Sequence, residues 1–127
     1  MEECRLSITT QANGEENGII RKGKILLSPL SAQINYCEEN AEVCLKLQNN
    51  RAIIERVGDY TLSLLLEEGK QTEGKIGIAG SMGNVGVYTH RVSYSSSKDS
   101  VLLSLHYDLL FGEEKQVMKL RLLARIG

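Results

Sequence analysis

The chain has 127 residues, and its 15 Lys and Arg residues are nearly balanced by 16 Asp and Glu residues. A chain of this length can bury a core without disulfides or metals, and its near-neutral charge removes any general attraction to nucleic acid or anionic membranes. It has no secretion signal and no apolar run of about 18 residues or more, so we expect no membrane contact, no nucleic-acid partner and a cytoplasmic location.

Alternation of apolar and polar residues with a period of two dominates the chain, which predicts β-strands throughout. The single Pro, the 12 Gly residues and the many short turn signals are typical of consecutive hairpins. No linker or repeat divides the chain, so we expect one domain over residues 1–127. The expected strands cover residues 4–12, 19–28, 32–38, 43–48, 51–57, 61–67, 74–79, 85–95, 100–110 and 115–126.

Hairpin turns fix which side chains share a face, because a shift of one residue in register exchanges the two faces of a strand. Asn tolerates positive φ, so Asn49 and Asn50 predict a two-residue turn that sets Arg56 opposite Val43. A three-residue loop over 58–60 then brings three leucines onto the same face, where burial of each is worth about 1.5–3 kcal/mol. The predicted inner face consists of Ile34, Tyr36, Val43, Leu45, Leu47, Ala52, Ile54, Arg56, Leu62, Leu64 and Leu66.

The loop over residues 39–42 is expected to contain four residues, which sets Tyr36 opposite Leu45 and Cys37 opposite Cys44. The three cysteines have no C-x-x-C spacing, and only two histidines accompany them. We therefore expect free thiols, no metal site and no other cofactor.

The last two hairpins are predicted in the same way. A turn at Gly112 and Glu113 pairs Tyr107 with Met118, and the other face of that hairpin is expected to be solvated. A turn over residues 96–99 places four side chains inward, opposite Tyr107 and its alternate neighbours. These four are Tyr88, His90, Val92 and Tyr94. The expected solvated face carries Ser104, His106, Asp108, Lys119, Arg121 and Arg125.

Hairpins that are apolar on one side must bury that side. A sheet of many short strands buries it either by closing into a barrel or by packing against a second sheet. We therefore predict an all-β fold, a closed antiparallel meander β-barrel of about 8–10 strands, with a two-sheet sandwich as the alternative. The glycine-rich run from Gly74 to Gly86 lacks a phosphate-loop spacing and a following helix. It predicts a bent or mobile strand connection, with a ligand-gating loop as the alternative.

Arg56 is the first candidate site residue, because a guanidinium on an apolar face keeps its charge and needs partners. It either pairs with a carboxylate such as Glu38, or reaches the rim, or anchors an anionic ligand. The hydroxyls of inward tyrosines also need partners, and His90 is either a core residue or part of the same lining. The candidate ligand-binding residues are Arg56, His90, Tyr36, Tyr88, Tyr94 and Tyr107.

Two function classes follow. The first is a non-enzymatic barrel that holds a small amphipathic or anionic ligand in its interior. The second is an interaction or homodimeric module with a solid core, because Ile53, Val57 and Leu65 form an outward apolar patch. A covering N-terminal segment is the other explanation of that patch. No nucleophile, base and carboxylate are predicted together, so no catalytic residue is assigned and a non-enzymatic role is favoured.

Four short motifs lie between about residues 30 and 110: Y-x-E at Tyr36 and Glu38, R-x-G at Arg56 and Gly58, the glycine-rich run before a strand ending in Thr89, and the pair Tyr107-Asp108. They are similar to motifs of a known family, the small YwiB-like bacterial proteins. The resemblance implies a calycin-like or lipocalin-like closed barrel in the bacterial cytoplasm. The family carries no established activity, so the resemblance transfers no catalytic residues.

Overall fold

The computed structural model describes residues 1–127, and each of the ten expected strands is present. With strands as its only regular elements, the chain has no helix that could cross a membrane. The strands are β1 (Glu2–Ala12), β2 (Glu15–Ser28), β3 (Ser31–Glu38), β4 (Ala41–Gln48), β5 (Arg51–Gly58), β6 (Tyr60–Glu67), β7 (Gln71–Ile78), β8 (Ser81–Ser96), β9 (Ser100–Phe111) and β10 (Glu114–Ile126).

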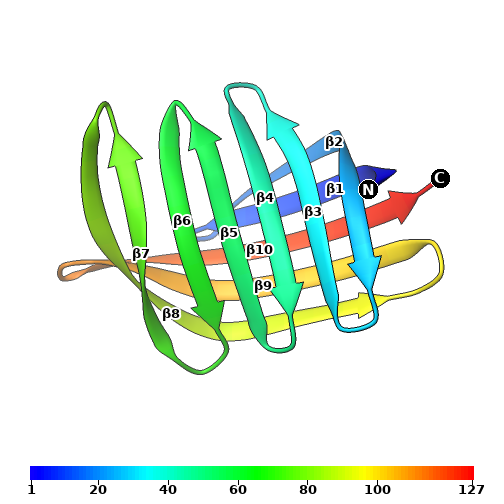
Figure 1. The fold of residues 1–127 in the computed structure, drawn as a ribbon. Coiled ribbons are helices and arrows are strands. Elements are labelled where there is room, and N and C mark those ends of the chain that lie inside the picture. Colours follow the sequence, from blue (N-terminus) through cyan, green and yellow to red (C-terminus); the bar gives the residue numbers. More distant parts are fainter.

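Every strand pairs antiparallel with its neighbours in sequence, and β1 pairs with β10 to close the ring. Figure 1 shows a flattened barrel in which β3 to β7 stand across a second layer formed by β1, β8, β9 and β10. The two longest strands, β2 and β8, connect the two layers. The predicted closed meander barrel is confirmed, and its architecture is consistent with the calycin-like expectation.

Three hairpins have the predicted register. Arg56 lies opposite Val43 on β4 and opposite Leu62 on β6, as the two turn lengths require. Tyr107 on β9 lies opposite Met118 on β10. The lengths of these short turns therefore predicted correctly which side chains of each following strand point into the barrel.

The predicted register between β3 and β4 is wrong by two residues. The turn has two residues, Glu39 and Asn40, so Tyr36 lies opposite Val43 rather than Leu45. A shift of two preserves the face, and Tyr36 is still inside. Cys37 and Cys44 are not opposite each other, and all three thiols are free.

The predicted facing of β8 is wrong over part of its length, because a β-bulge lies between Thr89 and Arg91. The extra residue, His90, has no partner on β9, and the strand on its amino-terminal side changes face. Thr89 is consequently buried, whereas Tyr88 and His90 point outward. The carboxy-terminal part of the strand keeps its inward Val92, although shifted by two residues to face Leu105.

A cluster of 24 buried residues from all parts of the barrel fills the interior. The glycine-rich run is the β7–β8 hairpin, which turns at Ala79 and Gly80 with both residues at positive φ. Gly74 is required there for packing, because a Cβ atom would lie 2.5 Å from the Leu64 side chain. The run is therefore a tightly packed strand pair and has no phosphate-loop geometry.

Candidate functional site

Arg56 is buried at one end of the barrel, with 8% of its surface exposed. Its Nη1 donates to the Tyr60 carbonyl oxygen at 2.8 Å, and Nη2 lies 2.8 Å from Asp59 Oδ1. Its Nε lies 3.5 Å from Glu38 Oε2, and its guanidinium lies 3.7 Å from the centre of the Tyr60 ring. Protein groups therefore surround this cation, which leaves little of it for a ligand.

The five other predicted site residues do not share one interior. Tyr36 and Tyr107 are buried in the core, and Tyr94 packs against it half-buried. Burial raises the pKa of Tyr107 to about 12, and burial together with the charge of Glu38 raises that of Tyr36. Tyr88 and His90 lie outside the barrel for the reason given above, so the predicted polar lining of an interior pocket does not form.

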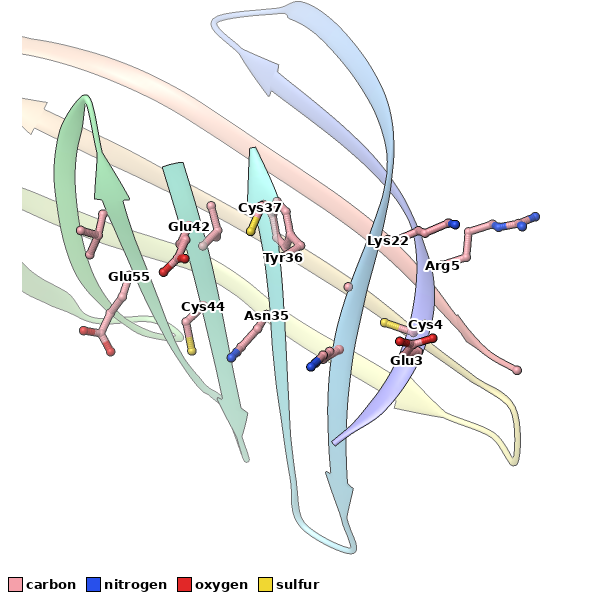
Figure 2. A pocket seen from close by; sticks show the side chains of 15 residues that line it. Glu3, Cys4, Arg5, Lys22, Asn35, Tyr36, Cys37, Glu42, Cys44 and Glu55 are labelled. Atoms are coloured by element: carbon pink, nitrogen blue, oxygen red, sulfur yellow. The ribbon is translucent and has the colours of Figure 1, made fainter. Parts of the chain in front are cut away.

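A groove of about 880 Å³ lies instead over the outer faces of β1 to β5. Its position follows from Gly23 in β2, where a Cβ atom would lie 2.6 Å from the Asn35 carbonyl oxygen and 2.8 Å from Leu6 Cδ1. The missing side chain allows β2 to pass close to its neighbours where it leaves β1 for β3. Figure 2 shows the lining residues. They are Glu3, Cys4, Arg5, Lys22, Gly23, Lys24, Asn35, Tyr36, Cys37, Glu42, Val43, Cys44, Glu55, Val57 and Gly127.

At one end of the groove, Arg5 and Lys22 belong to a row of cations that continues across three adjacent strands to Arg125, outside the groove lining. Arg5 on β1 lies directly opposite Lys22 on β2 and directly opposite Arg125 on β10. Figure 2 shows the Arg5 and Lys22 side chains extending in the same direction. None of the three makes an ion pair, and each lies opposite another cation, whereas Lys24, which also makes no ion pair, lies opposite Glu3. Like charges placed directly opposite each other destabilise a sheet. The repulsion within this cationic row therefore lowers the stability of the fold, and no ion pair offsets it.

The other end of the groove is acidic and partly apolar. Glu42 and Glu55 contribute carboxylates, and Glu55 lies 3.8 Å from Lys46 Nζ. Val57, which belongs both to this end of the groove and to the predicted apolar patch, is 64% exposed. Cys44 lies between the two ends, and burial raises the pKa of its thiol.

The predicted patch of Ile53, Val57 and Leu65 is present on the outside of β5 and β6. Ile53 lies opposite Leu65, and Ile53 and Val57 are exposed while Leu65 is half-buried. Strand β1, which could have been a covering segment, instead completes the barrel between β2 and β10.

A second polar cluster lies on the outer face beside the bulge, and the sequence did not reveal it. His90 Nε2 lies 2.8 Å from Asp108 Oδ2, and the His90 and His106 rings are 4.5 Å apart. Asp108 is only 6% exposed, contrary to the expected solvated position. Burial, together with the charges of His90 and Lys119, lowers the pKa of His106. A bulge at a single residue carries little sequence signal, which explains why this cluster was missed.

The fold and these sites define a small closed antiparallel barrel with a filled core and an external groove. Residues 4–122 match the family model described as a domain of unknown function (DUF1934), and the chain belongs to this family. The solved structure of the ywiB protein from Bacillus subtilis is similar to it, with a TM-score of 0.87 and 14% identity. That match covers 99% of this chain and 92% of the other, so the YwiB-like resemblance is confirmed at the level of the fold. No curated protein matches.

Proposed function

We propose that this protein is a non-enzymatic binding protein for a small amphipathic anion, and that the ligand occupies the external groove rather than the barrel interior. The single observation that carries the proposal is the unpaired, directly opposed pair of Arg5 and Lys22 at one end of that groove, with Arg125 opposite Arg5 just outside the lining. Three neighbouring cations repel each other in the free protein, and an anion placed among them would relieve that repulsion.

The remainder of the groove defines the class of ligand. Its volume of about 880 Å³ lies within the range of small-molecule sites. Asn35, Cys37 and Cys44 offer a weakly polar middle section, and Val57 offers apolar surface. Glu42 and Glu55 would repel a second negative charge at the far end. A ligand with one anionic group and an apolar body fits this distribution of charge.

Arg56 is not the anchor in this proposal. Its three nitrogens already face Glu38, Asp59 and the Tyr60 carbonyl oxygen. It stabilises the end of the barrel near the turn between β5 and β6.

The test uses 1-anilinonaphthalene-8-sulfonate, a fluorescent amphipathic anion, and N-phenyl-1-naphthylamine, which is similar in shape but uncharged. The variant is the double substitution Arg5→Thr/Lys22→Thr. The matched control, Lys115→Thr/Arg121→Thr, removes the same charge from exposed positions outside the groove. Near-UV circular dichroism establishes that each protein keeps its native packing, because molten states also bind the sulfonate and lose only the near-UV signal.

We expect the groove variant to weaken binding of the sulfonate by about tenfold or more, a loss of about 1.4 kcal/mol. The control should change it little, and the uncharged probe should be insensitive to both. Equal binding of the sulfonate by both double variants, or no binding by the folded parent, would overturn the proposal. Native mass spectrometry of the parent then searches for a retained natural ligand.

A second candidate function is homodimer formation through the Ile53, Val57 and Leu65 patch, favoured by the exposure of its first two members. The partner would be a second copy of this chain. Ile53→Asp changes the patch outside the groove, so it separates dimerisation from ligand binding. Sedimentation equilibrium should give a dimer for the parent and a monomer for the variant. A monomeric parent at high concentration eliminates this candidate.

A further inference from the structure

We propose that His90, His106 and Asp108 form a binding site for a divalent transition metal such as Zn²⁺. The site is independent of the groove and lies on the outer face of β8 and β9.

The β-bulge is the feature that assembles the three side chains. In a regular pairing His90 would point into the core, away from His106 and Asp108. The bulge makes His90 an extra residue and turns it outward, to the face where two alternate residues of β9 already lie. Bulges commonly re-aim a side chain beside a functional site. Two adjacent strands thereby contribute two imidazoles and one carboxylate to one small area.

Asp108 provides a second, independent observation. Its carboxyl group lies on the outer face, yet only 6% of the residue is exposed. An ionised carboxylate has about four acceptor positions, and burial is costly unless they are used. Asp108 makes one side-chain hydrogen bond, to His90. A cation held between Asp108 and the two imidazoles would use more of this capacity.

The distances are close to those of a metal site. One ligand atom from each residue can be chosen so that all lie within 4.8 Å of one another. His90 Nε2 and Asp108 Oδ2 are 2.8 Å apart, so they would have to separate by roughly half an ångström to reach the spacing of about 3.3–3.6 Å between two tetrahedral ligands of one metal ion. The His106 ring is tilted by 32° to that of His90 and must rotate to present a nitrogen. His106 is half-buried on the outer face.

The composition of the site indicates which metals it would hold. Imidazole suits Zn²⁺, Co²⁺, Ni²⁺ and Cu²⁺, whereas Mg²⁺ and Ca²⁺ prefer sites built of oxygen ligands. Three protein ligands leave at least one coordination position for water or another molecule. Two exposed cations lie directly opposite His106, Lys119 on β10 and Arg91 on β8, and both oppose metal binding. The site is therefore expected to be weaker than one enclosed by four ligands.

The chain contains two histidines, so ¹⁵N NMR of the imidazoles resolves the site directly. The experiment uses untagged protein in which Cys37→Ser and Cys44→Ser remove the two thiols nearest the surface. Zn²⁺ is titrated, and Co²⁺ binding is followed by absorbance. Both imidazoles should respond together, and coordination through Nε2 of His90 should place the proton of that ring on Nδ1.

His90→Ala and His106→Ala should each weaken metal binding by roughly tenfold or more, whereas Glu114→Gln, at an exposed carboxylate, should leave it unchanged. Lys119→Gln should strengthen it severalfold by removing the repelling charge. The proposal is overturned if the parent binds neither metal, if one imidazole alone responds, or if both histidine variants bind as the parent does. Asp108→Asn, if it folds, should also weaken binding, and the histidine variants decide the outcome if it does not.

Discussion

Substitution of Arg5 by Thr tests whether the cationic row is maintained at the expense of stability. Arg5 faces Lys22 on one side and Arg125 on the other, and all three side chains are exposed. Two unit charges about 6 Å apart in water repel by about 0.7 kcal/mol, so two such pairs cost about 1.4 kcal/mol. Physiological salt screens roughly half of this repulsion, and about 1 M salt removes most of it.

We therefore expect Arg5→Thr to raise the free energy of unfolding by about 1 kcal/mol at low salt, with the gain shrinking as salt increases. Thr is favourable in strands, so the backbone should tolerate the change. Urea unfolding at a series of salt concentrations measures the effect. The gain in stability should accompany the loss of sulfonate binding described above.

The control is Arg51→Thr, which makes the same change at a compensated position. Arg51 pairs with Glu67 at 3.0 Å, so its loss should lower stability slightly, by about 0.2–1 kcal/mol. The reasoning fails if Arg5→Thr destabilises the protein at low salt, or if its effect does not depend on salt. Either result would mean that the row is already neutralised within the folded chain.

Three further predictions concern the stability of the barrel. Ala79 has a φ of 51° in the β7–β8 turn, a conformation that Asn adopts more readily than Ala. Ala79→Asn should therefore stabilise the protein by about 0.5–1 kcal/mol in urea unfolding, and a loss of stability would contradict the turn geometry. The Thr89 hydroxyl is fully buried without a hydrogen bond, so Thr89→Val should raise the unfolding free energy by about 1–2 kcal/mol, whereas a decrease would reveal a hidden partner. Folding raises the pKa of Tyr107 to about 12, so the unfolded chain loses the Tyr107 proton at a lower pH than the folded chain does. The stabilisation that comes from this pKa difference is therefore complete below a pH of about 10 and is lost as the pH rises from there towards 12. Urea midpoints from pH 9 upward should therefore fall, and the slope should decrease in Tyr107→Phe; an unchanged slope would refute the assignment.

The sequence predicted the fold because errors of two residues in register are harmless to the inner face. The turn before β4 has two residues where the pattern predicts four, yet Tyr36 still lies in the core. Burial and turn length are local properties, and each hairpin transmits them to the next. A closed barrel then follows from the number of half-apolar strands.

The candidate sites depended on features that alternation does not encode. One extra residue at His90 was enough to move two predicted site residues out of the barrel and to bring His90 beside Asp108. The groove arises from the path of β2 at Gly23, which is a matter of three-dimensional shape. Arg56 was correctly placed on the inner face, and Glu38 was correctly named as a carboxylate partner. The two shorter contacts of Arg56, with Asp59 and with the Tyr60 carbonyl oxygen, were not predicted. Both partners belong to the predicted loop over residues 58–60, to which the register assigns no opposite residues.

The closing seam between the first and last strands has a consequence for how the molecule reaches its native state. Cys4 pairs with Ile126, so this seam joins residues at opposite ends of the chain, whereas each remaining strand pair is joined by a short turn. Pairing β1 with β10 closes the longest loop of any strand pair and therefore has the largest loss of chain entropy. We therefore expect this pair to form late in folding. Until then β1 and β10 present unpaired edges, which makes a nascent or truncated chain prone to edge-to-edge association.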